Sequence, residues 1–115
     1  MKEHFGCPIQ ATSNVFSGKW KVFILWQLSF SPLRFAQLRD QLPGISEKVL
    51  TSQLRQLEAD GLVTRTSFDA VPPRVEYALS ERGNDLVPVL ETMCDWGIKH
   101  LGVVPSYRLR TTVPA

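Results

Sequence analysis

The feature that most constrains the fold is a change of hydrophobic period at Gly61. Before it, three leucines recur at helical spacing and form one apolar stripe, namely Leu50, Leu54 and Leu57. After it, the segments 62–68 (LVTRTSF) and 74–80 (RVEYALS) tend to alternate and are rich in β-branched and aromatic residues, which is typical of strands. Glycine often ends a helix. The pattern therefore predicts a helix that leads directly into a β-hairpin.

The predicted helix, residues 46–60, has a clear beginning. Ser46 is a good N-cap, and Glu47 favours the positive end of the helix dipole. At about 100° per residue, polar side chains lie opposite the leucine stripe or flank it. These are Lys48, Ser52 and Arg55, flanked by Thr51 and Gln56. The helix thus has an apolar back and a polar, partly basic front.

The segments around this helix complete a recognisable order. Pro8 suits the first position of a short helix, the stretch 19–30 is apolar nearly all round, and Arg34 begins a helix that Pro43-Gly44 ends. Ser80 caps a final long helix, which a proline at position 88 kinks or restarts. The fold class is mainly α with a small β-hairpin (α+β). Two short helices joined by a tight turn and followed by a hairpin describe a winged helix-turn-helix.

Composition excludes several classes of function. The chain has 115 residues and a net charge of +2, which permits a nucleic-acid partner without requiring one. No apolar run is long enough to span a bilayer, and two distant cysteines favour a reducing, cytoplasmic setting. We expect no membrane association.

Catalytic and metal-binding motifs are absent from the sequence. It contains no glycine-rich phosphate loop, no CxxC motif and no histidine placed beside a nucleophile, so we expect no enzyme and no cofactor. His4 and Cys7 have a spacing that metals use, but two ligands do not make a zinc site.

Four blocks of the sequence, in this order and spacing, resemble the HxlR-type transcriptional regulators, which are relatives of the MarR regulators. The blocks are GKWKVFILWQL, PLRFAQLRDQLPGISEKVLTSQLRQLEADGLVTR, VPPRVEYALSERG and LVPVLETMCDWG. The resemblance covers Cys7 to Leu101, and we expect one domain over residues 1–104. The segment after Leu101 has two prolines and no clear helical period, so we expect a loosely ordered tail over 105–115.

The resemblance implies a homodimer that binds pseudo-palindromic operator DNA. The helix 46–60 would enter the major groove, the hairpin 62–80 would act as the wing, and the first and last helices would form the dimer interface. In some members of the family a cysteine just before a proline near the N-terminus senses electrophiles or oxidants. Cys7-Pro8 occupies that position here.

Eight residues are the candidate DNA contacts. The front of the helix contributes Ser46, Lys48, Thr51, Ser52 and Arg55, and three arginines outside it are Arg34, Arg65 and Arg74. Arg55 could bind guanine through two hydrogen bonds, worth roughly 1–3 kcal/mol of discrimination, whereas the hydroxyl groups suit bases or phosphates alike. Arg65 and Arg74 are expected close to the wing tip, on opposite strands, where they would contact phosphate or the minor groove. An ordinary cross-strand salt bridge with Asp69 or Glu76 is the alternative.

The final helix is apolar on more than one face, which favours a second subunit over burial within one. The candidate interface residues are Val87, Leu90, Met93, Cys94, Ile98 and Leu101. A two-fold dimer would match two half-sites about 34 Å apart. Cys94 lies in the apolar stripe and is expected to be inert.

Cys7 is a candidate redox-sensing residue. If Pro8 is the first helical residue, Cys7 is the N-cap, where the helix dipole lowers the pKa of a thiol. The alternative is an unreactive cap packed at the dimer interface.

These observations favour a dimeric, sequence-specific DNA-binding transcriptional regulator, with Cys7 as the candidate for a response to oxidants or electrophiles. A repressor is favoured over an activator, because the sequence shows no separate domain for contacting polymerase. The alternative is a winged-helix module that acts through protein–protein contacts, or one that responds to a small-molecule ligand instead of a thiol signal. Binding that is insensitive to salt would favour protein contacts, because phosphate contacts release counterions.

Overall fold

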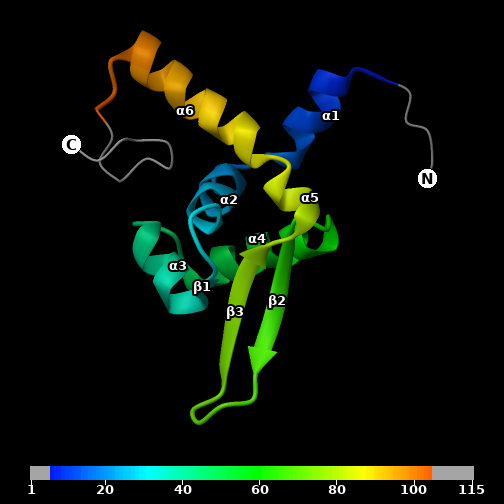
Figure 1. Ribbon diagram of the computed structural model, residues 1–115, viewed down its shortest axis with the longest axis vertical. Helices are drawn as coiled ribbons and strands as arrows, with labels where there is room; N and C mark the ends of the chain where they lie inside the picture. The colour runs from blue at the N-terminus through cyan, green and yellow to red at the C-terminus, as the bar shows by residue number, and fades with distance from the viewer. Residues whose placement is uncertain (1–5, 105–115) are drawn as a thin grey trace.

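The computed structural model describes residues 6–104 of the chain, so the predicted tail over 105–115 lies outside the described residues. The elements follow the order α1 (Pro8–Val15), α2 (Lys21–Leu28), β1 (Leu33–Arg34), α3 (Phe35–Gln41), α4 (Glu47–Ala59), β2 (Val63–Phe68), β3 (Arg74–Leu79), α5 (Glu81–Asn84) and α6 (Val87–Leu101) (Figure 1). This arrangement confirms the predicted winged helix-turn-helix, mainly α with a small sheet.

The sheet contains one strand that the sequence did not predict. It is antiparallel with the order β1-β3-β2, and β1 pairs Leu33 with Tyr77 and Arg34 with Glu76. A strand of two residues is too short to show a hydrophobic period, and its partner lies far away along the chain. The predicted hairpin is therefore the larger part of a three-stranded sheet, and β1 joins the wing to the beginning of α3.

The core lies where α2, α3, α4 and the base of the sheet meet. Its largest fully buried side chains are Ile24, Leu25, Leu38, Leu50, Leu54 and Leu57. The three leucines of α4 are among them, so the predicted stripe is confirmed as the back of the helix. As expected from its apolar sequence, α2 is covered on most sides, with Trp26 and Leu28 also buried. The core thus holds α4 from behind and leaves its front exposed.

The beginning and end of α4 follow from local chemistry. The Ser46 Oγ accepts a hydrogen bond from the backbone N–H of Val49 at 3.1 Å, which caps the helix as predicted. Gly61 adopts a φ of 76°, a left-handed conformation that favours glycine, and the chain then enters β2. The predicted change of period at Gly61 is thus the real boundary between helix and wing.

The predicted final helix is two helices. Ser80 caps the single turn α5, and α6 begins at Val87 with Pro88 in its first turn. Pro88 therefore restarts the helix, one of the two outcomes expected from the sequence. In Figure 1, α1 and α6 project from one end of the molecule and the β2–β3 wing projects from the other.

Candidate nucleic-acid interface

The front of α4 is an exposed polar surface. Of the predicted contact residues on this helix, Ser46, Lys48, Ser52 and Arg55 are exposed and Thr51 is half-buried. The leucines behind them are at most 1% exposed. Because the back of the helix is fixed in the core, the direction of the front is fixed as well. This is the division that a helix needs if it is to enter a DNA groove at a defined angle.

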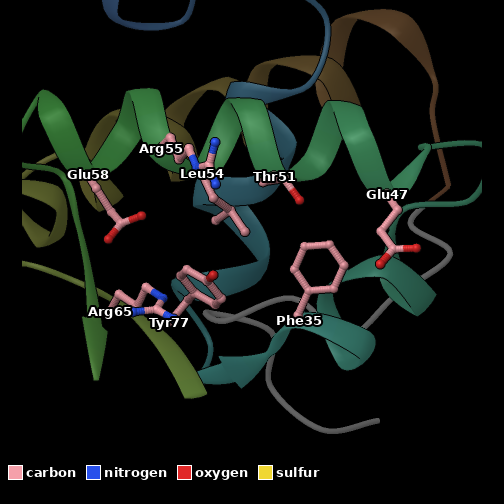
Figure 2. A pocket seen from close by; sticks show the side chains of 8 residues that line it. All are labelled: Phe35, Glu47, Thr51, Leu54, Arg55, Glu58, Arg65 and Tyr77. Atoms are coloured by element: carbon pink, nitrogen blue, oxygen red, sulfur yellow. The ribbon is translucent and has the colours of Figure 1, made fainter. Parts of the chain in front are cut away.

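Two hollows flank the front of α4. One, of about 530 Å³, lies between α4 and the sheet and is lined by Phe35, Glu47, Thr51, Leu54, Arg55, Glu58, Arg65 and Tyr77 (Figure 2). The other, of about 600 Å³, lies along the exposed face of α4, whose residues alone line it: Glu47, Lys48, Thr51, Ser52, Arg55 and Gln56.

A crest separates these hollows, since three residues line both of them: Glu47, Thr51 and Arg55. Their spacing of i, i+4 and i+8 places them in one row along the helix. The crest residues are therefore the part of α4 that projects between the two hollows.

The two predicted arginines of the wing lie at different distances from its tip. Arg74 pairs with Phe68 in the last rung before the tip, as expected, whereas Arg65 pairs with Tyr77 nearer the base. The expectation that both lie close to the tip is therefore wrong for Arg65. In Figure 2 the side chain of Arg65 lies beside Tyr77, across the hollow from the helix.

Arg74 is held by two neighbours. Its Nε lies 3.6 Å from the Glu76 Oε2, and its guanidinium lies 4.7 Å from the centre of the Phe68 ring. Glu76 is two residues further along the same strand, so this is not the cross-strand pair that the sequence suggested. An aromatic face and a carboxylate both restrict the guanidinium, which leaves it oriented at the wing tip.

Arg34 lies at the point where β1 passes into α3. It is exposed, and its backbone N–H donates a hydrogen bond to the Gln37 Oε1 at 2.9 Å. Its strand partner is Glu76, so Arg34 stands on the sheet and not on the front of α4.

The sequence reasoning did not select two acidic side chains at this surface. Glu47 lies 3.7 Å from Arg39 between the Nη1 and Oε2 atoms, and its side chain is 71% exposed. Glu58 points into the hollow beside the sheet (Figure 2). The sequence signal for Glu47 is its helical spacing of four and eight residues from Thr51 and Arg55.

The outer faces of α1 and α6 expose apolar side chains. No residue of α1 is buried, and Ile9 is exposed on it. On α6, Val89, Met93, Trp96 and Leu101 are exposed, with Trp96 at 57% and Met93 at 50%. Exposed apolar side chains on two helices at the same end of the molecule favour burial against another protein surface.

The structure corrects two of the predicted interface residues. Val87 and Leu90 are buried in the chain itself, and Leu90 is part of the central core. Cys94 and Ile98 are half-buried, while Met93 and Leu101 are exposed. The exposure of these residues is greater in the later turns of α6 because the first turns of the helix pack on the core and the later turns extend beyond it.

Cys7 is the N-cap residue of α1, as the sequence predicted. Its backbone is extended, with φ −80° and ψ 120°, and its carbonyl accepts a hydrogen bond from the Ala11 N–H at 3.0 Å. The residue is exposed, so its thiol is accessible to small reagents in one subunit. His4, the other half of the considered metal pair, lies outside the described residues.

Within residues 6–104, helices fall short of the length and apolar character needed to cross a bilayer. The same residues bring together no group of three side chains suited to holding a metal ion.

Comparisons with known proteins agree with this geometry. The family model described as HxlR-like helix-turn-helix matches residues 15–104. The uncharacterized HTH-type transcriptional regulator YtcD of Bacillus subtilis (strain 168) is 43% identical over 103 residues, which cover 90% of this chain and 82% of that protein.

Two solved structures extend the similarity to three dimensions. The redox regulator HypR in its reduced form is 40% identical with a TM-score of 0.79, covering 88% of this chain and all of that chain (100%). A regulator assigned to the MarR family, from Porphyromonas gingivalis W83, is 32% identical with a TM-score of 0.78, covering 87% of this chain and 98% of that chain. The chain therefore belongs to the HxlR-like helix-turn-helix family of transcriptional regulators.

Proposed function

We propose that this regulator binds a pseudo-palindromic operator as a homodimer, with α4 of each subunit in the major groove and the β2–β3 wing beside it. In such a complex, the two α4 helices meet half-sites about 34 Å apart. Binding at a promoter excludes polymerase, so the regulator acts as a repressor.

The observation that carries this proposal is the division of α4 into a buried back and an exposed front. The leucines of the back lock the helix into the core, while the crest and its neighbours Lys48 and Ser52 face outward between two hollows. The wing lies across one of these hollows, so Arg65 approaches the same surface (Figure 2). Base-edge contacts from the front and phosphate contacts from Arg34, Arg65 and Arg74 together give register and specificity.

The dimer part of the proposal rests on α1 and α6. Their exposed side chains Ile9, Met93, Trp96 and Leu101 are large and apolar, and a helix with no buried residue gains little from its own subunit. Both helices project at the end opposite the wing (Figure 1). A two-fold contact there leaves both α4 helices and both wings free for DNA.

The redox part of the proposal rests on Cys7. Its thiol is exposed at the N-terminus of α1, on the same end of the molecule as the proposed interface. Oxidation of the Cys7 thiols of the two subunits to a disulfide transfers two electrons to the oxidant and releases two protons. The disulfide would change how α1 packs in the dimer. The similarity to HypR, which is described as a redox regulator, supports this choice of signal.

Protection of DNA from nuclease tests the proposal. The regulator is incubated with the DNA that flanks its own gene, with and without a thiol oxidant such as diamide, and the Cys7→Ser and Cys94→Ser variants are treated in parallel. We expect two protected half-sites one helical turn apart, and loss of protection on oxidation in the wild type and in Cys94→Ser. Cys7→Ser should keep its protection.

The outcomes separate the parts of the proposal. Protection that does not change with oxidant would retain the regulator and remove Cys7 from its mechanism. If no DNA is protected there, selection from random DNA decides whether the chain binds DNA elsewhere. A DNA affinity that falls steeply with salt would exclude the protein-binding module.

A further inference from the structure

The crest of α4 begins with a carboxylate, which is unexpected on a surface proposed to meet DNA. Glu47 is the first residue of the helix, and its side chain is 71% exposed. It lines both hollows, so it projects along the same row as Thr51 and Arg55. Residues near the N-terminus of a recognition helix reach base edges first. Glu47 is therefore at the position where a side chain meets a base, and phosphate groups would repel it.

The ion pair with Arg39 does not account for this carboxylate. The Arg39 Nη1 and Glu47 Oε2 atoms are 3.7 Å apart, and the two side chains are 49% and 71% exposed. Pairs that are this exposed contribute little to stability. An acid in the first turn also complements the helix dipole, but that interaction requires no particular row on the helix.

A carboxylate can only accept hydrogen bonds, so the major groove offers it few partners. The donors on base edges are the cytosine N4 amino group and the adenine N6 amino group. Adenine places the acceptor N7 beside its amino group, and N7 repels a carboxylate. Cytosine carries the donor alone. The chemistry of the groove thus leaves cytosine as the base that fits Glu47.

We propose that Glu47 is a specificity-determining residue that recognises a cytosine in each half-site, accepting a hydrogen bond from its N4 amino group. This inference rests on the proposed function, because it requires α4 to lie in the major groove. Arg55, at the other end of the crest, suits guanine through O6 and N7. The crest then recognises a cytosine with Glu47 and a guanine with Arg55, while the small Thr51 between them tolerates several bases.

The crest also predicts the distance between the two bases. Residues 47 and 55 are eight positions apart, which is about 12 Å along a helix that rises about 1.5 Å per residue. Successive bases on one strand are about 3.4 Å apart. The cytosine and the guanine are therefore expected about three to four base pairs apart in each half-site.

Glu58 provides a matched control on the same helix. Its carboxylate lines only the hollow beside the sheet, and it lies beyond Arg55 near the C-terminal end of α4, away from the end that reaches base edges first. Replacing either glutamate with glutamine removes one negative charge from α4 and leaves the side-chain size nearly unchanged. Both variants should gain phosphate attraction, but only the variant at Glu47 should change the base preference.

The experiment is selection of bound sequences from random DNA with the full chain, for the wild type, Glu47→Gln, Glu58→Gln and Arg55→Gln. Competition with duplexes changed at single positions follows at one fixed salt concentration. We expect a cytosine position in the wild type that loses about ten-fold preference, equivalent to about 1.4 kcal/mol, in Glu47→Gln. Glu58→Gln should keep that preference, and Arg55→Gln should lose a guanine three to four base pairs away.

A further variant distinguishes a loss of the base contact from a loss of the folded structure. Glu47→Asp keeps the charge and the interaction with the helix dipole but shortens the side chain, so it should fold normally and still lose the cytosine preference. Thermal unfolding of every variant is measured beside the selections.

Three results would overturn the inference. The first is a base preference that is the same in the wild type and in Glu47→Gln. The second is an equal change in Glu58→Gln, which would assign the effect to charge alone. The third is a wild type that selects no motif, and this result would contradict the proposed function itself.

Discussion

The Ser80 hydroxyl donates a hydrogen bond of 2.6 Å to the carbonyl oxygen of Gly61, which joins the end of β3 to the turn that follows α4. The same Oγ accepts a hydrogen bond from the Gly83 N–H at 3.0 Å, and the Ser80 N–H donates to the Leu62 carbonyl at 3.0 Å. The side chain of Ser80 thus joins the α4–β2 turn to the junction of β3 and α5, which lies 19 residues further along the chain.

Ser80→Ala is expected to destabilise the fold by about 1–2 kcal/mol, because it removes the cap of α5 and leaves the Gly61 carbonyl without its partner. Chemical denaturation followed by circular dichroism measures the change. Ser67→Ala, on the exposed part of β2, is the control and should shift stability by less than about 0.5 kcal/mol. Equal effects from the two substitutions would contradict the role assigned to Ser80.

Gly83→Ala is expected to cost roughly 2–3 kcal/mol, because α5 packs directly on the α4–β2 turn. A Cβ at this position would lie 2.2 Å from the Leu62 carbonyl oxygen, a backbone atom that can move only if the turn moves. The exposed neighbour Asn84→Ala should have little effect. Denaturant midpoints of the two variants are compared, and a Gly83→Ala protein as stable as the wild type would show that the turn gives way easily.

Arg74→Gln is expected to weaken binding to all DNA sequences alike and to lower the slope of log affinity against log salt by about 1. Glu76→Gln should have the opposite effect on affinity, because it removes the carboxylate 3.6 Å from the Arg74 guanidinium. Titrations at several salt concentrations provide both values, with Arg82→Gln on α5 as the control. A specific loss at one base pair would instead place Arg74 at a base edge.

Trp96→Glu is expected to convert the dimer into monomers, since it places a charge among the exposed apolar side chains of α6. Sedimentation equilibrium measures the change, and affinity for a two-half-site duplex should fall with it. Thr64→Glu, which introduces the same charge on the exposed face of β2, should remain dimeric. A wild type that sediments as a monomer would refute the proposed interface.

Local patterns in the sequence predicted much of the fold. The leucine stripe, the Ser46 cap and the change of period at Gly61 each depend on residues close together in the chain, and each is confirmed. An interruption of the last helix at Pro88, as a kink or a restart, was also predicted because proline lacks a backbone N–H, and the structure shows the restart.

These local patterns could not predict contacts between residues that lie far apart in the sequence. β1 forms because two residues meet β3 across the sheet, and no period marks them. The distance of Arg65 from the wing tip depends on the strand register, which is decided by the pairing of β2 with β3 and not by composition. Val87 and Leu90 looked equivalent to Leu101 in one stripe, but only the first turns of α6 reach the core.

The sequence by itself therefore determined the elements, their order and the polar front of α4, because helix caps and periodicity act over a few residues. The tertiary structure decided which side chains share a surface. It brought the wing beside α4, so that Arg65 and Tyr77 line one hollow together with the crest. The hollow beside the sheet is bounded by segments from different parts of the chain, so it exists only once α3, α4 and the sheet have packed around the same core.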